Sequence, residues 1–160
     1  LELPWQPERL LAALLRTRVT GRLDSRVANW KGEQRHLLLD VGHNPHAAEY
    51  LARRLATRPL SGRRLAVFGL LADKDLGGVL EPLLGLVQDW AVAPLPTPRS
   101  RPAEELQSVL SARGAQVSVH ADIAAALEAQ CAKATADDEI LVFGSFYSVA
   151  DALGWLDDQA

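Results

Sequence analysis

The sequence predicts an α/β fold in which a mostly parallel sheet of about six strands carries helices on both faces. From residue 35 onward, five short apolar runs of strand length alternate with five helical stripes, which is the order of elements that a parallel sheet with crossover helices requires. The apolar runs are continuously hydrophobic, as are strands that are buried on both faces.

Two elements precede this alternation. Leucines recur at helical spacing over residues 10–15, and we interpret residues 1–18 as a linker or helical arm from a preceding domain. Residues 21–30 alternate well enough for a strand, and residues 31–34 form a turn. The packing residues of this strand would be Leu23, Val27 and Trp30. It would add an antiparallel edge to the sheet.

Five strand–helix units follow. The strands are expected in the segments HLLLDV, RLAVFGLL, DWAVAPL, QVSVH and EILVFGSF. The helices are expected around residues 48–55, 76–83, 106–110, 123–131 and 149–156, where apolar residues recur at helical spacing. Pro82 should kink or shorten the second helix, because proline has no N–H to donate. The proline-rich stretch over residues 94–102 is expected to be a rigid loop over the sheet.

The composition is ordinary for a soluble domain. The 160 residues suit one compact core. Seventeen basic and twenty acidic residues give a formal charge of −3, which does not support a nucleic-acid or anionic-membrane partner. No apolar run is long enough to span a membrane and no signal peptide is apparent, so no membrane partner is expected.

A single cysteine, Cys131, cannot form an intrachain disulfide, which favours a reducing, cytoplasmic location. It lies in an alanine-rich helical pattern and is interpreted as a buried apolar residue rather than a nucleophile. The chain starts at Leu1 and contains no methionine, so we expect it to be a fragment of a longer protein.

The segment from Asp40 to His46 carries the strongest functional signal. It follows a buried strand, and ligands of open α/β sheets bind at the carboxyl ends of the strands. Asn44 is a good N-cap and Pro45 suits the first helical position. A carboxylate at Asp40 can accept hydrogen bonds from a ribose, and His43 beside a helix N-terminus can meet a phosphate oxygen. The alternative is that Asp40 ties down its own loop and His46 is a solvated first-turn residue.

Several complete catalytic motifs are absent from the sequence. There is no G-x-G-x-x-G after a strand and no G-x-x-x-x-G-K-[ST] loop. The four histidines lack partners at metal-binding spacing, and no G-x-S-x-G elbow is present. The chain is therefore not predicted to be a complete catalytic unit, and no metal site is expected in it.

Three motifs in register resemble folylpolyglutamate synthase and dihydrofolate synthase. LLLDVGHNPHAAEYL resembles the family's D-x-A-H-N-P-x-A segment, VFGLLADKDLGGVLEPL its G-x-x-x-D-K-D strand and helix, and ILVFGSFYSVADAL its closing G-S-F-Y-x-V-A segment. VTGRLDSR resembles the linker strand that opens the carboxy-terminal domain. Together these matches cover nearly the whole chain.

The resemblance implies a place in the Mur ligase superfamily of ATP-dependent amide ligases. Residues 19–160 would be the Rossmann-like carboxy-terminal domain, and its partner would be an amino-terminal P-loop ATPase domain of the same polypeptide that supplies the Mg²⁺ ligands. The complete enzyme would use ATP to convert a carboxylate to an acyl phosphate, which the amine of L-glutamate attacks. It would make dihydrofolate from dihydropteroate, extend reduced folates such as tetrahydrofolate, or do both. We expect the isolated chain to be inactive and monomeric.

The resemblance also implies roles for individual residues. Arg22 matches an arginine that reaches the ATP phosphates, and Asp40 an aspartate on the ribose side of ATP. His43 matches the histidine beside the transferring centre and is the candidate catalytic residue. Ser145 matches a serine near the incoming glutamate.

Three further residues are expected to support the site loops: Asn44, Lys74 and Asp75. Asp75 is also a good N-cap, so its role can be structural. Two alternative functions remain at this point. One is a stand-alone nucleotide- or metabolite-binding module that uses the same loop, and the other is a Mur-type cell-wall ligase domain, although GSFYSVADAL fits the folate branch better.

Overall fold

The computed structural model describes residues 23–159 as six strands and a set of helices. The strands are β1 (Asp24–Trp30), β2 (Glu33–Asp40), β3 (Arg64–Phe68), β4 (Asp89–Val92), β5 (Val117–Val119) and β6 (Glu139–Phe143). The helices are α2 (Pro45–Ala56), α3 (Leu76–Leu80), the 3₁₀ helix η1 (Glu81–Leu83), α4 (Ala103–Ala112), α5 (Ile123–Lys133) and α6 (Phe146–Gln159). The expected helical arm, the domain start at residue 19 and Arg22 lie outside the described residues.

All six strands form one sheet in the order β1-β2-β6-β3-β4-β5. β1 pairs with β2 antiparallel, and every other neighbouring pair is parallel. The predicted fold class is therefore confirmed, including the antiparallel edge. The last strand, β6, lies between β2 and β3, so the chain must return across the sheet after β5.

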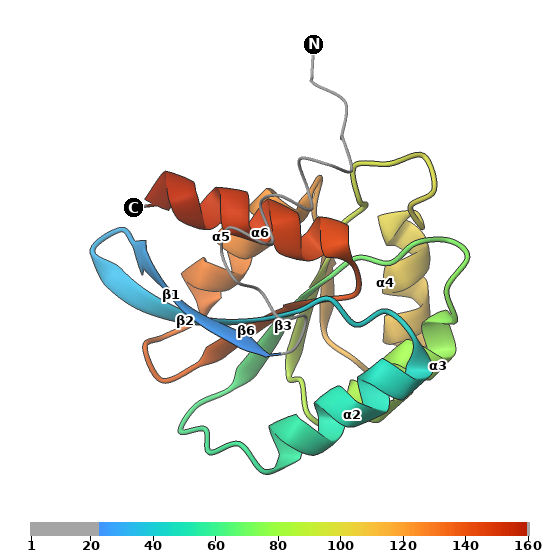
Figure 1. Ribbon diagram of the computed structural model, residues 1–160, viewed down its shortest axis with the longest axis horizontal. Coiled ribbons are helices and arrows are strands. Elements are labelled where there is room, and N and C mark those ends of the chain that lie inside the picture. Colours follow the sequence, from blue (N-terminus) through green and yellow to red (C-terminus); the bar gives the residue numbers. More distant parts are fainter. Residues whose placement is uncertain (1–22, 160) are drawn as a thin grey trace.

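Helices cover both faces of the sheet, as predicted (Figure 1). α5 and α6 pack on one face, whereas α2, α3, η1 and α4 pack on the other. Within β2, Leu37 and Leu39 contact the α5–α6 layer and Leu38 contacts the α2 layer. Burial on both faces explains why these strands are apolar at every position. No helix in residues 23–159 is both long enough and apolar enough to cross a membrane.

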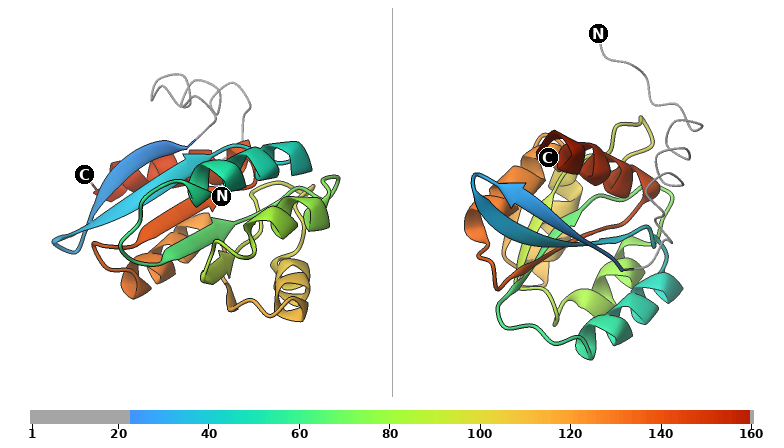
Figure 2. Two further views of the ribbon diagram at one scale, coloured as in Figure 1. Left: turned by 90° about the horizontal axis from the view of Figure 1, so that it is seen from below. Right: turned by 60° about the vertical axis from the view of Figure 1, so that its left-hand side comes forward.

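The β1–β2 hairpin forms one edge of the sheet (Figure 2). Its two-residue turn has φ of 50° at Lys31 and 82° at Gly32, the positive values that a tight hairpin turn needs. The prediction that Val27 packs in the core is wrong, because its side chain is 52% exposed and the neighbouring Ala28 is the buried residue. The α2 layer does not extend over β1, so the residues of β1 on that face meet solvent.

Helix ends follow local sequence signals. The helix expected around residues 76–83 is α3 followed by η1, with Pro82 inside the 3₁₀ turn, so the predicted kink is confirmed.

At the tip of the hairpin, Glu128 of α5 accepts hydrogen bonds from the indoles of Trp30 (3.0 Å) and Trp155 (2.9 Å). The bond from Trp30 and then that from Trp155 lower the pKa of Glu128. This carboxylate joins the antiparallel edge to both helices of one layer.

Candidate functional site

The candidate site is built where three neighbouring parallel strands end together. Asp40, the last residue of β2, pairs with Phe143 of β6, and Phe143 pairs in turn with Phe68 of β3. The segments that follow, residues 41–44, 69–75 and 144–145, therefore start at the same edge of the sheet. All three carry residues that the sequence singled out, although the first and the last lie about a hundred positions apart along the chain.

The turn after β6 depends on a glycine. Gly144 has φ of +115°, which side chains of L-residues rarely adopt. A Cβ at this position would also overlap the carbonyl oxygen of Gly69, which follows β3. The backbones after β6 and β3 therefore touch, and this contact holds two of the three segments together. Gly144 lies in the G-S-F-Y motif but was not among the site residues predicted from the sequence.

The β2–α2 loop uses Asp40 as an internal brace. Its carboxylate is 4% exposed and accepts hydrogen bonds from the backbone N–H of Gly42 (2.7 Å) and of Leu23 (3.3 Å). These are the contacts expected if the residue ties down its own loop. Asn44 caps α2 by accepting from the N–H of Ala47 at 2.8 Å, with Pro45 at the first helical position. The loop geometry is thus set by its own polar groups.

His43 is half-buried in the same loop. Its Nδ1 lies 3.2 Å from the carbonyl oxygen of Val41. A carbonyl oxygen only accepts, so Nδ1 must carry the proton in this hydrogen bond. Nε2 makes no hydrogen bond to any residue in 23–159, and this nitrogen is the one that a ligand can use. His46 is exposed on the first turn of α2.

Ser145 lies directly before α6 and is only 3% exposed. Its hydroxyl accepts a hydrogen bond from the N–H of Ser148 at 3.0 Å and lies 3.0 Å from the hydroxyl of Ser148. Ser145 therefore caps the amino-terminal turn of α6. Contact between this serine and glutamate stays a prediction.

The β3–α3 segment carries Lys74 and Asp75. Asp75 caps α3 by accepting from the N–H of Gly78 at 3.0 Å. The helix that follows this segment, α3, packs against the start of α2 so closely that a Cβ on Gly78 would lie 2.6 Å from Cγ of Pro45. The ammonium of Lys74 forms no ion pair with residues 23–159. The third segment thus contacts the start of α2.

The proline-rich loop over residues 94–102 braces this segment, a role that was not predicted from the sequence. The N–H of Ala72 donates to the carbonyl oxygen of Arg99 at 2.7 Å, and the N–H of Arg101 donates to that of Leu70 at 2.9 Å. The guanidinium of Arg101 also donates to the backbone carbonyl of Lys74 and pairs with Glu105. The sequence signal for this role was the four-residue spacing of Arg101 and Glu105. Oppositely charged residues at this spacing pair along a helix, so the pair can hold an arginine near the start of a helix.

Two side chains outside these loops have pKa values that are raised above their usual ranges. Burial raises the pKa of the Cys131 thiol to about 12, so this residue has little thiolate at neutral pH. Burial, with a smaller contribution from the nearby charge of Asp122, raises the pKa of Asp151 to about 7. Within residues 23–159 no group of three or more His, Cys, Asp or Glu side chains could hold a metal ion.

A family model described as "Mur ligase, glutamate ligase domain" matches residues 21–146. The chain belongs to this family. Its matched region contains all three segments of the candidate site, up to the first residue of α6.

Curated relatives connect the chain with folate enzymes. It is 45% identical over 125 residues to dihydrofolate synthase/folylpolyglutamate synthase of Escherichia coli, a match that covers 78% of this chain and 29% of the relative. The enzyme of the same name from Haemophilus influenzae is 36% identical over 120 residues, with 72% of this chain and 27% of the relative covered. The chain thus spans less than a third of the length of these two relatives.

Solved structures agree with the fold. E. coli FolC in complex with DHPP and ADP superimposes with a TM-score of 0.77 and 34% identity, covering 99% of this chain and 41% of that one. The bifunctional folylpolyglutamate synthase/dihydrofolate synthase of Yersinia pestis, complexed with AMPPNP and Mn, gives a TM-score of 0.75 and 35% identity, covering 98% of this chain and 36% of that one. The chain is similar to the carboxy-terminal domain of these enzymes.

Proposed function

We propose that the chain acts as the carboxy-terminal domain of an ATP-dependent ligase that adds L-glutamate to dihydropteroate, to reduced folates, or to both. One observation carries this proposal: the level ends of β2, β6 and β3 bring the Asp40–His43, Ser145 and Lys74–Asp75 segments to one edge of the sheet. The curated relatives support the folate branch over a cell-wall ligase, because those named above are folate enzymes.

The proposed chemistry proceeds through an acyl phosphate. A carboxylate oxygen of the folate substrate attacks the terminal phosphorus of ATP, and ADP leaves. The amine of glutamate then attacks the acyl carbon, inorganic phosphate leaves with the C–O bonding electrons, and the nitrogen loses a proton to give the amide. Both steps move negative charge onto phosphate oxygens, so a donor placed beside these oxygens lowers the barriers.

His43 is the residue of this chain best placed to supply such a donor. Its ring is held through Nδ1 by the Val41 carbonyl, so its orientation is set before substrate binds. Nε2 remains for a phosphate oxygen and must then carry a proton to donate, which requires the imidazolium form. A fixed ring loses little entropy on binding, as preorganised stabilisation requires.

The remaining residues would hold the substrates. A carboxylate oxygen has room for more than one hydrogen bond, so Asp40 can accept from the ribose of ATP while it braces its loop. The amino terminus of α6, whose first turn Ser145 caps, favours a carboxylate of glutamate through the positive end of the helix dipole. Arg22 is proposed to reach the phosphates.

Mg²⁺ would neutralise the ATP phosphates when bound, but residues 23–159 contain no acidic cluster that fits it. Its ligands and the P-loop are therefore proposed to lie in an amino-terminal ATPase domain of the same polypeptide. Closure of the two domains would exclude water from the acyl phosphate. The expected monomeric state and cytoplasmic location stay predictions.

The test uses a full-length parent protein supplied with ATP, Mg²⁺, glutamate and either dihydropteroate or tetrahydrofolate. We expect one ADP released per amide formed. If the substrate carboxylate is labelled with ¹⁸O, the acyl phosphate route requires one labelled oxygen in the released inorganic phosphate. Unlabelled phosphate would rule out that route.

The isolated 160-residue chain serves as the matched control and should show no turnover. Glutamate ligation by this chain alone would contradict the division of the site between two domains. ATP binding by the chain alone with an affinity equal to that of the parent would instead favour a stand-alone nucleotide-binding module.

A further inference from the structure

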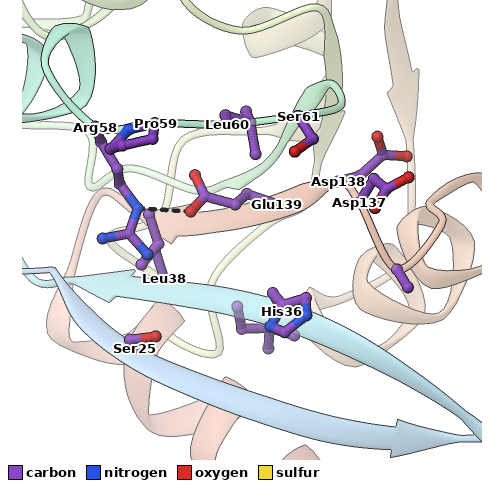
Figure 3. Close-up of a pocket in the computed structure, with 12 residues that line it drawn as sticks. Ser25, His36, Leu38, Arg58, Pro59, Leu60, Ser61, Asp137, Asp138 and Glu139 are labelled. Atoms are coloured by element: carbon purple, nitrogen blue, oxygen red, sulfur yellow. Dashed lines mark hydrogen bonds and ion pairs between the residues drawn. The ribbon is translucent and has the colours of Figure 1, made fainter.

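A polar pocket lies at the other ends of the strands from the candidate site (Figure 3). It has a volume of about 220 Å³ and is enclosed by β1, β2, the start of β6 and the loop that follows α2. Its polar lining includes Ser25, His36, Arg58, Ser61 and Glu139. His36 and Glu139 pair across β2 and β6, four residues before the level strand ends that carry the candidate site. The two sites therefore lie at opposite ends of the same strands.

The charge at the Arg58 end of this pocket is positive. Glu139 has a side chain only 7% exposed, and its carboxylate accepts from Nε of Arg58 at 2.6 Å and from Nη2 of Arg64 at 3.0 Å. Two guanidinium groups thus share one carboxylate, which leaves one positive charge in excess. The side chain of Arg58 is 36% exposed, and its two terminal nitrogens form no hydrogen bond with residues 23–159.

The neutral groups around Arg58 are also without partners. In the part of the chain that the structure describes, neither the hydroxyls of Ser25 and Ser61 nor the imidazole of His36 forms a hydrogen bond. Figure 3 shows Ser25 on the strand that faces Arg58 and His36 on the neighbouring strand, whereas Ser61 lies at the other end of the pocket, beside Asp137 and Asp138. Two guanidinium nitrogens, the Ser25 hydroxyl and one ring nitrogen can therefore donate into the part of the pocket beside Arg58.

The acidic residues of the lining do not cancel the positive charge beside Arg58. Asp138 is 4% exposed, and its carboxylate is already used by the backbone N–H groups of Arg63 (2.7 Å) and Thr135 (2.8 Å) and by the Arg63 side chain. Asp137 is exposed and lies at the end of the pocket away from Arg58 (Figure 3). A ligand beside Arg58 therefore meets donors and a net positive charge.

We propose that this pocket binds a small oxyanion, a phosphate or a carboxylate group, separately from the candidate ligase site. The two terminal nitrogens of Arg58 form a fork that matches two oxygens of such a group. Ser25, on the strand that faces Arg58, donates to a remaining oxygen, and His36 lines the floor. Nε of Arg58 stays on Glu139, so the fork is held in place before the anion arrives.

The test is a titration of the 160-residue chain with inorganic phosphate and, in a second arm, with acetate, followed by backbone amide NMR. We expect saturable shifts at Ser25, Arg58 and Glu139 in the millimolar range. Tighter binding of phosphate identifies a phosphate group as the ligand, and tighter binding of acetate identifies a carboxylate. The absence of saturation with either anion up to about 50 mM, a concentration far above a useful affinity, would overturn the proposal.

Variants locate the binding. Arg58→Gln should weaken it at least about tenfold and still fold, since Glu139 keeps its bond to Arg64. Arg99→Gln removes an exposed arginine that pairs with Asp73 elsewhere on the surface and should bind as the unchanged chain does. His43→Ala should also leave these shifts unchanged, which separates this pocket from the proposed ligase site. Equal binding by Arg58→Gln, or shifts confined to residues 41–46, would contradict the assignment.

Discussion

Two of the three strand-to-helix connections at the candidate site, those after the neighbouring strands β2 and β6, differ in length. Residues 41–44 join β2 to α2, whereas Gly144 and Ser145 alone join β6 to α6. In the shorter connection, the hydroxyl of Ser145 is buried and bonded to the following turn. In the longer one, Asp40 braces the loop and the ring of His43 stays half-exposed with Nε2 uncommitted among residues 23–159.

The difference in length explains why the polar residues of the two connections have different roles. A two-residue connection has no length left for a side chain that serves a ligand, so its polar group completes the helix start. A four-residue connection can satisfy its backbone with Asp40 and Asn44 and still present another residue. We therefore expect substitutions in the β6–α6 turn to affect folding, and substitution of His43 to affect chemistry.

The largest effect is expected from Gly144→Ala. The new Cβ would overlap the Gly69 carbonyl oxygen and would require a positive φ that alanine rarely adopts. Together these should lower the free energy of unfolding by about 3–5 kcal/mol, as measured by urea denaturation of the chain. Gly154→Ala is the matched control, because it lies in α6 with open space around it and should gain up to about 1 kcal/mol in helix propensity. Equal stability of the two variants would mean that the turn tolerates a side chain.

The second effect separates chemistry from folding. In the parent enzyme, His43→Ala should lower kcat by about 10²–10³, because a preorganised donor acts mainly in the transition state. KM for ATP should rise much less. His46→Ala changes an exposed residue on the first turn of α2, directly after the loop that contains His43, and should have only a small effect. Equal losses in both variants, measured by steady-state kinetics, would show that the loop as a whole matters and that His43 has no special role.

Asp40→Ala should show a mixed result. Removing a buried acceptor of two backbone N–H groups should lower the free energy of unfolding by about 2–3 kcal/mol in urea denaturation. If Asp40 also contacts the ribose, ATP affinity of the folded parent should fall roughly ten- to a hundredfold in calorimetry. Unchanged ATP affinity would leave Asp40 as a brace alone. Asp73→Ala, an exposed member of the neighbouring loop, should change stability by less than about 0.5 kcal/mol.

The smallest effect concerns pH and the helix that Ser145 caps. The pKa of Asp151 is raised to about 7 by burial and by Asp122, so the folded state holds a proton that the unfolded state releases near pH 4. The contribution of Asp151 to stability should therefore be fully present below pH 4 and should be lost as the pH rises to about 7. Because the carboxyl is only partly buried, this loss should be on the order of 1 kcal/mol. Asp151→Asn should match the unchanged chain at pH 4 and exceed it at pH 8 in thermal denaturation; a lower stability of the variant at pH 8 would contradict this.

Local signals in the sequence determined most of the elements and their ends. The continuously apolar runs marked the strands, because residues buried on both faces leave no polar alternation. Pro82 marked the end of α3, and Asn44 and Pro45 marked the start of α2, because caps and proline act within a few residues of their own position. The resemblance of three motifs to folate ligases then named Asp40, His43 and Ser145 as a group.

Only the tertiary structure decided how these residues are used. The exposure of Val27 depends on where the helices of one layer stop. The commitment of Asp40 to the N–H of Leu23 joins positions 17 residues apart, and the bond between Arg58 and Glu139 joins positions 81 apart. The contact of Gly144 with Gly69 follows from the insertion of β6 between β2 and β3. Each of these contacts arises from docking between distant segments, whereas periodicity and capping report only the conformation of the segment that contains them.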